Sequence, residues 1–234
     1  PIRWPAAMAA CRATHSGAPN FAFELAVRKS DPAERAALDL SALRVILSGA
    51  EPIRPATVDA FNAAFAPAGL RPEAVTAAYG LAETMVAVAL ERWDRPYGTA
   101  EAGGKAHVSC GPPLPGLEAR IVDPETGVPL ADGAVGEIWL KGTSVAKGYW
   151  NRPDESAAVF GARLAGSEDA YLRTGDLGFL IGGELHIAGR IKDLIILNGR
   201  NIYPQDVELA AEGAHPILRR GCVAAFAVDG DDGE

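Results

Sequence analysis

The chain has 234 residues, and 48% of them are hydrophobic, which is enough to form a core in one large domain or two small ones. A formal net charge of −8 argues against a nucleic-acid or membrane-surface partner, because both recruit basic faces. No apolar run is long enough to span a bilayer, and widely spaced cysteines and histidines predict a cytoplasmic setting with neither a disulfide framework nor a zinc site.

The first hundred residues alternate between helical and strand-like patterns. Helices are predicted over 3–13 and 21–29 and from Pro32 and Pro55 onward. The helix at Pro32 has Asp31 as its N-cap and Glu34 at its third position, which is the pattern of a capping box. Short buried strands that end in turns are predicted over 43–47 and 77–80, with HSGAPN (15–20) as a loop. This alternation predicts a mostly parallel α/β layer over residues 1–104.

From residue 105 the sequence becomes β-rich. Short strands separated by turn clusters are predicted over 119–122, 136–140, 171–172 and 184–187. They indicate an antiparallel or barrel-like subdomain over residues 105–189.

The remaining residues follow a third pattern. From Asp193 it is strand, loop, helix, with Pro204 in the first turn of the helix, and then a strand over 222–228. We therefore expect a domain boundary near residues 189–192 and the start of a small, mobile α+β domain over 190–234. A final strand needs partners and few residues remain to supply them. Together with the missing initiator Met, this predicts a fragment of a longer protein at both ends.

Two stretches with possible chemistry follow predicted strands. In SGAEP (48–52), Gly49 lets the backbone approach a flat ligand at the carboxyl end of a strand, although a plain turn would explain it as well. In AYGLAET (78–84), an aromatic ring, a glycine and a carboxylate suit stacking, close backbone approach at Gly80 and Mg²⁺ or phosphate binding. The alternative is a strand-to-helix turn with Glu83 solvated on the helix.

Two further stretches carry charged candidates. In YLRTGD (171–176), Asp176 beside a glycine could accept hydrogen bonds from a vicinal diol such as ribose, or it could simply cap a turn. In GRIKDLIILNGRNIYPQDVE (189–208), Arg190 suits phosphate or ribose oxygens, or it could be a surface arginine paired with a nearby acid.

Together, and in this order, these stretches resemble the adenylate-forming superfamily of acyl-CoA synthetases, luciferases and peptide-synthetase adenylation domains. GEIWLKGTSVAKGYWN (136–151) belongs to the same set of motifs. Within that superfamily the chain is most similar to fatty acyl-AMP ligases, through HSGAPNFAFELAVRK (15–29), GAEP, VSCGPPLPG (108–116) and above all GRNIYPQD (199–206).

The resemblance implies a two-step reaction. A fatty acid would be activated with ATP and Mg²⁺ to an acyl-adenylate, with release of pyrophosphate. The acyl group would then pass to the phosphopantetheine arm of an acyl carrier protein, typically in a polyketide or peptide synthase system. Such chemistry needs positioning and cations to neutralise phosphate charge.

The resemblance also implies residue roles. Adenine would lie between Tyr79, with Gly80, and the backbone of Gly49, Ala50 and Glu51. Glu83 would bind Mg²⁺, Thr84 would lie near the α-phosphate, and Asp176 and Arg190 would reach the ribose; Glu83, Thr84 and Arg190 are the candidate catalytic residues. Lys192 matches the hinge about which the small domain rotates between the two half-reactions.

Two family elements are expected outside the sequence, namely a phosphate loop before Pro1 and a catalytic lysine after Glu234. The segment from Met85 to Val108 is also short for the insertion that such ligases use to exclude coenzyme A. Three functions therefore stay open: a ligase that transfers to a carrier protein, a ligase that forms acyl-coenzyme A, and a non-catalytic relative that only binds nucleotide.

Overall fold

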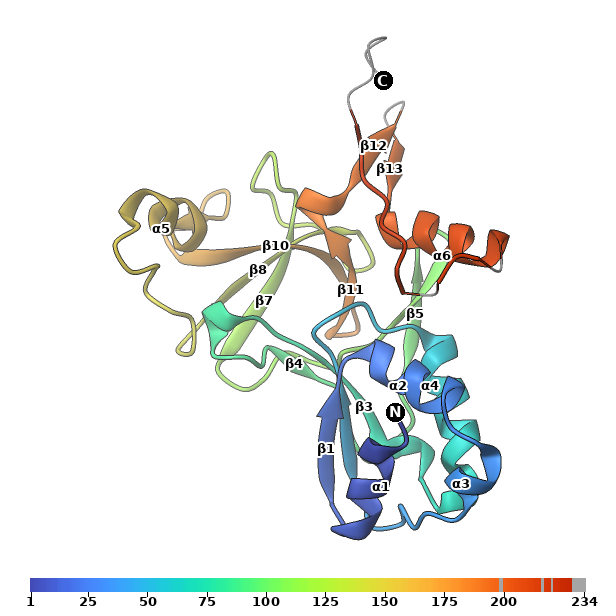
Figure 1. Ribbon diagram of the computed structural model, residues 1–234. Coiled ribbons are helices and arrows are strands. Elements are labelled where there is room, and N and C mark those ends of the chain that lie inside the picture. The colour runs from blue at the N-terminus through green and yellow to red at the C-terminus, as the bar shows by residue number, and fades with distance from the viewer. Residues whose placement is uncertain (198–199, 216, 220, 229–234) are drawn as a thin grey trace.

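The computed structural model describes residues 1–197, 200–215, 217–219 and 221–228. The predicted parallel layer is present in its first hundred residues (Figure 1). The strands of its sheet lie in chain order: β1 (His15–Ala18), β2 (Val45–Ser48), β3 (Val75–Tyr79) and β4 (Ala89–Leu90). The first three run parallel, and β4 pairs antiparallel with β3.

The prediction of a loop over HSGAPN was wrong, because most of it is strand β1. The residues of β1 pair with those of β2 in register, from His15 opposite Val45 to Ala18 opposite Ser48. Its sequence, HSGA, has no Val, Ile, Thr, Phe, Tyr or Trp, so the strand depends on backbone pairing with β2.

The helices of the layer are α1 (Arg3–Ala10), α2 (Asn20–Arg28), α3 (Pro32–Ala36) and α4 (Pro55–Phe65). The predicted capping box at Asp31 and Glu34 is confirmed. Phe61, at the centre of the core, contacts the rings of Phe23 at 4.9 Å, Phe65 at 4.6 Å and Trp4 at 6.0 Å between centroids. These aromatic rings join α1, α2 and α4 to the sheet in one apolar core, to which β2 and β3 contribute Ile46 and Val75.

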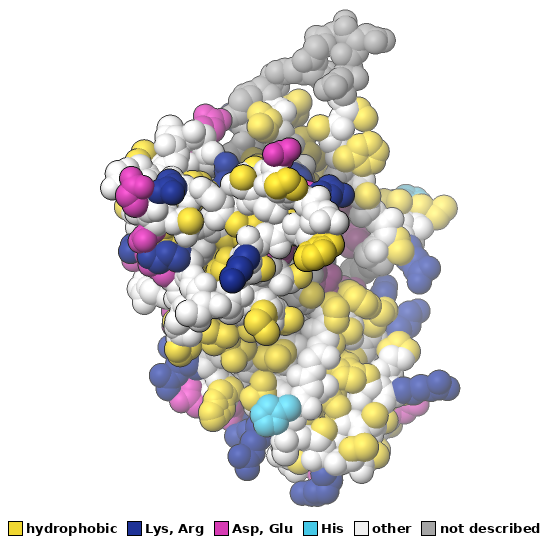
Figure 2. All heavy atoms as spheres, turned by 90° about the vertical axis from the view of Figure 1, so that its left-hand side faces the viewer, with side chains coloured by type: hydrophobic (Ala, Val, Ile, Leu, Met, Phe, Trp, Pro, Cys, Tyr) yellow, Lys and Arg dark blue, Asp and Glu magenta, His cyan; other side chains and the backbone are white. Residues whose placement is uncertain are grey.

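The opposite side of this sheet is more open. Figure 2, seen from the left of Figure 1, shows hydrophobic side chains gathered over the lower half of the molecule. On β2, Ile46 is fully buried whereas its neighbour Leu47 is 38% exposed. The alternation of a strand therefore divides β2 between a helix-covered face and an uncovered one.

The predicted β-rich region forms a curled antiparallel sheet in the order β11–β10–β8–β7 (Figure 1). Its strands are β7 (Leu117–Val122), β8 (Gly136–Gly142), β10 (Ala170–Ile181) and β11 (Glu184–Arg190), and β9 (Ala162–Arg163) adds to one end of β10. The hairpin of β5 (Thr99–Ala102) and β6 (Lys105–Val108) precedes it. Strand β10 is far longer than predicted, since a bulge between Arg173 and Leu177 carries it past the Thr-Gly-Asp stretch. Helix α5 (Pro153–Phe160) was not predicted.

The last described part has the predicted strand, loop and helix: the hairpin of β12 (Ile195–Leu197) and β13 (Arg200–Ile202), then α6 (Pro204–Ala214). Residues 198–199, where GRNIYPQD begins, and 229–234 lie outside the described residues. The strand expected over 222–228 is absent from this described segment, which has no strand pairing. Its Ala225 N–H instead donates to the Glu208 side chain at 3.0 Å, and Phe226 and Val228 are each 74% exposed.

The sequence led us to expect neither a membrane-spanning segment nor a zinc site, and the structure can be searched for both in the residues that it describes. There, no helix is long and apolar enough to cross a membrane, and no group of three or more His, Cys, Asp or Glu side chains could hold a metal ion. Cys11, Cys110 and Cys222 are free.

Candidate active site

The SGAEP and AYG stretches meet at the carboxyl ends of β2 and β3. A Cβ on Gly49 would lie 2.8 Å from the carbonyl oxygen of Ala78, so the backbone after β2 can pass this close to β3 only with glycine there. Ala50 follows in the left-handed conformation (φ +64°). The Glu51 carboxylate accepts a hydrogen bond from the Phe21 N–H at 2.5 Å, which ties the turn to α2. SGAEP is thus a constrained turn beside Tyr79.

The segment after Tyr79 folds back sharply on itself. A Cβ on Gly80 would lie 1.5 Å from the carbonyl oxygen of Val86, so no other residue fits this turn. Val86 itself, a β-branched residue, has φ +102°, and Met85 has φ +62°. Strain of this kind collects at functional sites. It makes the segment from Gly80 to Val86 a candidate ligand-binding turn.

Glu83 and Thr84 lie in this turn, on a single 3-10 turn over Ala82–Thr84. Glu83 is half-buried there and is therefore not fully solvated. The Glu83 side chain accepts a hydrogen bond from the hydroxyl of Tyr149 at 2.6 Å. This bond, with burial adding to it, raises the pKa of Tyr149 to about 12. Thr84 is only 1% exposed, and its hydroxyl donates to the Leu81 carbonyl at 3.1 Å, so it is turned into the fold.

Asp176 joins the parallel layer to the curled sheet. One of its carboxylate oxygens accepts from the Tyr79 hydroxyl at 2.7 Å, and the other accepts from Arg190 Nε at 2.8 Å. The residue is 8% exposed, and it lies opposite Arg190 in the β10–β11 register. Asp176 therefore does not cap its own turn: its partners are 97 and 14 residues away along the chain.

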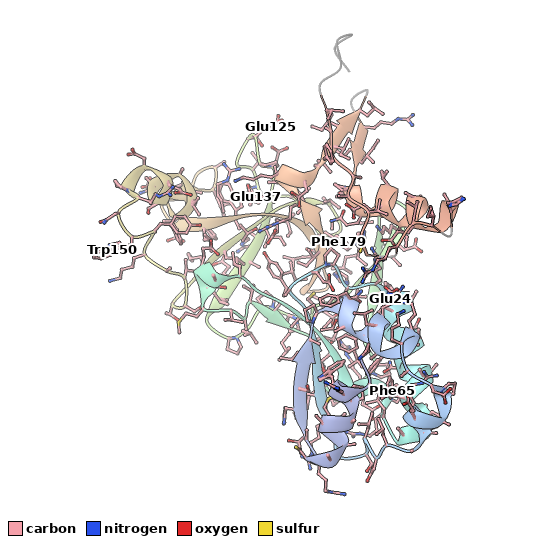
Figure 3. The ribbon with its side chains drawn as sticks, viewed as in Figure 1. Glu24, Phe65, Glu125, Glu137, Trp150 and Phe179 are labelled. Carbon is pink, nitrogen blue, oxygen red and sulfur yellow. The ribbon has the colours of Figure 1, made fainter. Side chains whose placement is uncertain are left out.

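The bulge that carries Asp176 is fixed by Glu137, which lies within the curled sheet (Figure 3). The Glu137 carboxylate accepts from the Gly175 N–H at 3.1 Å, from Trp139 Nε1 at 2.9 Å and from two nitrogens of Arg173. The Thr174 hydroxyl in turn accepts from the Asp176 N–H at 3.0 Å. A buried carboxylate that holds a bulge is the device that aims Asp176 at Tyr79.

The charges at this centre reinforce one another. Burial, then the neighbouring Asp176 carboxylate, raises the pKa of Tyr79, so that its hydroxyl remains a donor at neutral pH. The hydrogen bond to Asp176 likewise raises the pKa of Arg190. Arg190 is 64% exposed, so its interpretation as a surface arginine paired with an acid is correct as far as it goes, but the acid is the candidate ribose ligand.

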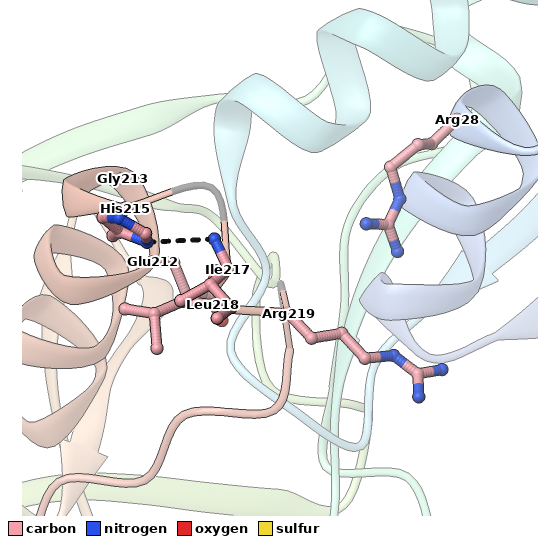
Figure 4. A pocket seen from close by; sticks show the side chains of 7 residues that line it. All are labelled: Arg28, Glu212, Gly213, His215, Ile217, Leu218 and Arg219. Atoms are coloured by element: carbon pink, nitrogen blue, oxygen red, sulfur yellow. Dashed lines mark hydrogen bonds between the residues drawn. The ribbon is translucent and has the colours of Figure 1, made fainter.

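Lys192 lies apart from this cluster. It is exposed on the 3-10 turn Ile191–Asp193, which connects β11 to the β12–β13 hairpin. A cavity of about 590 Å³ also lies away from this cluster, between α2 and the end of α6, and it is lined in part by Arg28 and Arg219 (Figure 4). The structure thus joins Gly49, Tyr79, Asp176 and Arg190 in one centre and places Glu83 in the adjoining turn.

These residues can be tested for their fit to a nucleotide and a cation. The Asp176 carboxylate, which accepts from Tyr79 and Arg190, suits a pair of vicinal hydroxyls. The turns at Gly49 and Gly80 let a flat base approach the backbone near Tyr79. Glu83 is a lone carboxylate, which suits Mg²⁺ because this ion usually keeps several waters and takes one or two carboxylates with substrate phosphates. The described residues therefore fit Mg²⁺ bound together with a phosphate and not as a separate protein-held ion.

The chain is similar to known proteins. A family model described as "AMP-binding enzyme" matches residues 1–150. The chain belongs to this family.

Relatives within the AMP-binding family extend the match to nearly the whole chain. It is 45% identical over 250 residues to the medium-chain-fatty-acid–[acyl-carrier-protein] ligase JamA of Moorena producens, covering 98% of this chain and 42% of that protein. It is 43% identical over 254 residues to the long-chain-fatty-acid–AMP ligase FadD26 of Mycobacterium tuberculosis, covering 99% and 43%. The solved fatty acyl-adenylate ligase of L. pneumophila, in complex with acyl adenylate and pyrophosphate, superposes with a TM-score of 0.79 at 39% identity, covering 92% and 41%. The chain thus spans about 42% of the length of these curated relatives.

Two residues of this chain were missed by reasoning from sequence. Tyr149 is part of the KGYWN stretch, but nothing local links it to Glu83, 66 residues away. Glu137 looked like an ordinary strand residue, although a glutamate between a glycine and an isoleucine inside a predicted buried strand is a signal that a partner is needed.

Proposed function

We propose that the full-length protein carrying this chain activates a fatty acid with ATP. The acid's carboxylate oxygen attacks the α-phosphorus, the bond from that phosphorus to the bridging oxygen breaks, and pyrophosphate leaves with the electron pair. The product is an acyl-adenylate. The observation that carries this proposal is the Tyr79–Asp176–Arg190 centre at the carboxyl end of a parallel sheet, in a chain related to fatty-acid–AMP ligases.

Each residue of the centre has a proposed role. The Tyr79 ring and the backbone of Gly49, Ala50 and Glu51 hold the adenine from two sides, with Gly80 leaving room. Asp176 accepts from the ribose hydroxyls, and Arg190 moves from Asp176 toward the ribose and phosphate as nucleotide enters.

The turn beyond Tyr79 binds the metal cation in this proposal. Glu83 holds Mg²⁺, which when bound supplies positive charge next to the phosphates. Thr84 keeps the turn in shape through its hydrogen bond to Leu81, and we place it near the α-phosphate through its backbone, since its hydroxyl is engaged.

We further propose that the acyl group then passes to the phosphopantetheine thiol of an acyl carrier protein. The thiol sulfur attacks the acyl carbon and loses its proton to solvent, the bond from that carbon to the phosphate oxygen breaks, AMP leaves with the electron pair, and a thioester forms. Support comes from JamA, whose name specifies an acyl-carrier-protein ligase. Lys192, exposed just beyond β11, is proposed as the hinge about which the small domain rotates, so that different residues cover the centre in the two steps. We also propose that the protein is cytoplasmic.

The test uses the full-length protein with a fatty acid, ATP and Mg²⁺, and either an acyl carrier protein or coenzyme A. We expect ATP-dependent pyrophosphate release and acylated carrier protein, both detected by mass spectrometry. Abundant acyl-coenzyme A would instead favour the coenzyme A ligase, and nucleotide binding without pyrophosphate release would favour the non-catalytic alternative.

Asp176→Ala tests the ribose role within the same assay. Loss of a hydrogen bond from the ribose to a charged group, worth about 1.5–3 kcal/mol, should raise the KM for ATP about 10- to 100-fold. Asp169→Ala is the matched control, because Asp169 is 59% exposed and pairs with Lys141. An unchanged KM for ATP in Asp176→Ala would remove the ribose role.

A further inference from the structure

Tyr149 contacts the candidate metal-binding turn from a distant part of the chain. Its hydroxyl donates to Glu83 Oε1 at 2.6 Å, and the N–H of Ala146, on the same loop, donates to the main-chain carbonyl of Glu83 at 2.8 Å. One loop therefore holds both the backbone and the side chain of Glu83.

The loop is itself fixed by α5. The Tyr149 ring packs edge to face on Phe160, with 5.1 Å between centroids, and its N–H donates to the Ser156 hydroxyl at 2.8 Å. Gly148 has φ +147°, and a Cβ there would lie 2.8 Å from the same hydroxyl. These contacts restrict the conformation of Tyr149, so that its hydrogen bond to Glu83 costs little further conformational entropy.

The partner it reaches is otherwise free to rotate. The terminal torsion of a glutamate is broad and roughly two-fold, so a carboxylate with one exposed face samples many orientations. Among the described residues, no donor other than Tyr149 reaches the Glu83 side chain. The Tyr149 hydroxyl therefore selects the orientation of Glu83 and leaves Oε2 as the open oxygen.

We propose that Tyr149 is a positioning residue: its hydroxyl orients the Glu83 carboxylate so that Oε2 faces the Mg²⁺ that accompanies ATP. This inference rests on the proposed function. Groups that orient a metal-binding carboxylate typically change metal affinity 10- to 100-fold when they are removed. The proposal gives a role to the KGYWN stretch and to α5, which the reaction itself does not require.

The experiment measures cation affinity without turnover. Mn²⁺ replaces Mg²⁺ in the full-length protein with ATP and no fatty acid, and water-proton relaxation reports the protein–ATP–Mn²⁺ complex. We expect Tyr149→Phe to raise the dissociation constant of Mn²⁺ about tenfold, and to raise the Mg²⁺ concentration for half-maximal pyrophosphate release by a similar factor at little change in kcat. The matched control is Tyr171→Phe, which removes a comparable tyrosine–glutamate bond of 3.0 Å to Glu118, and it should change neither value.

A double-mutant cycle separates positioning from a general structural effect. If Tyr149 acts through Glu83, then Tyr149→Phe should have no further effect on Mn²⁺ binding in a Glu83→Ala background. A Mn²⁺ affinity within twofold of wild type in Tyr149→Phe, or an equal loss in both backgrounds, would overturn the inference while the wild-type protein still makes acyl-adenylate. A wild-type protein that makes none overturns the proposed function, and this inference with it.

Discussion

The two main regions of the molecule are held together by different interactions. The parallel layer has an aromatic core of Trp4, Phe23, Phe61 and Phe65, and apart from Glu91, next to β4, its buried polar groups are uncharged. Among the described residues, the other buried carboxylates and the buried histidine lie in the curled sheet: Glu137, Asp176 and His186. Non-directional packing stabilises the layer, whereas charge-assisted hydrogen bonds fix side-chain positions in the curled sheet. The candidate site lies where the two meet, and it takes its backbone turns from one and its oriented charges from the other.

The largest expected effect is in the aromatic core. Phe61 is fully buried and contacts three other rings, so Phe61→Ala should lower the free energy of unfolding by about 3–5 kcal/mol. Chemical denaturation followed by the fluorescence of Trp4, a direct neighbour, measures the loss. Phe21→Ala is the control, because Phe21 is 53% exposed on α2 and should change stability by no more than about 0.5 kcal/mol. Equal effects of the two variants would mean that the packing assigned to this region does not stabilise it.

The next effect tests the curled sheet through Glu137. Its removal leaves Trp139 Nε1 and the Gly175 N–H without their acceptor and Arg173 without its acid, so Glu137→Ala should cost about 3 kcal/mol. Unlike Phe61→Ala, it should also raise the KM for ATP, because the bulge that aims Asp176 is released. Denaturation followed by Trp139 fluorescence and ATP kinetics give the two values. The control Glu118→Ala removes a half-buried acid that pairs with the exposed Arg120 and with Lys141, and it should cost about 1 kcal/mol. A Glu137→Ala protein with a normal KM for ATP would break the link from this carboxylate to the site.

The sequence predicted the elements whose signals are local. The capping box at Asp31, the spacing of Phe61 and Phe65, and proline at the start of α4 and α6 each fix a helix by nearest-neighbour physics. Strand β1 and the absent strand at 222–228 were misassigned for one reason: strand formation depends on a partner that is distant in sequence. HSGA has such a partner in β2, whereas the apolar segment at 222–228 has none in the described chain.

The site shows the same division. Gly49, Tyr79, Asp176 and Arg190 were found from motifs, and the structure brings them together. The bonds that orient them, from Glu137 to Gly175 and from Tyr149 to Glu83, join residues 38 and 66 positions apart. A single sequence does not show which residues such bonds join, because the two partners lie far apart along the chain.

The smallest expected effect is a loss of folding stability at acidic pH. Burial lowers the pKa of His186, which stacks on Phe179, and of His107, which meets the Phe179 ring edge to face. The unfolded chain therefore binds protons on these histidines at higher pH than the folded chain does. Their contribution to stability is complete above a pH of about 6.5, the ordinary histidine value, and falls as the pH drops below it toward the lowered folded values.

The loss should be confined to the curled sheet, since both histidines lie in or beside it and the aromatic core of the layer has none. His186→Phe keeps the stacking on Phe179 and removes one titrating group, so the variant should lose less stability than wild type between pH 7.5 and 5.5. In variants that keep only Trp139 or only Trp4 of the four tryptophans, fluorescence reports the curled sheet or the parallel layer, and only the Trp139 transition should change its pH dependence. His15→Gln, an exposed change on β1, should leave both transitions as they are. If the Trp4 transition loses stability in acid as steeply as that of Trp139, the two regions unfold as one unit. The different interactions that hold the layer and the curled sheet would then not give them separate stabilities.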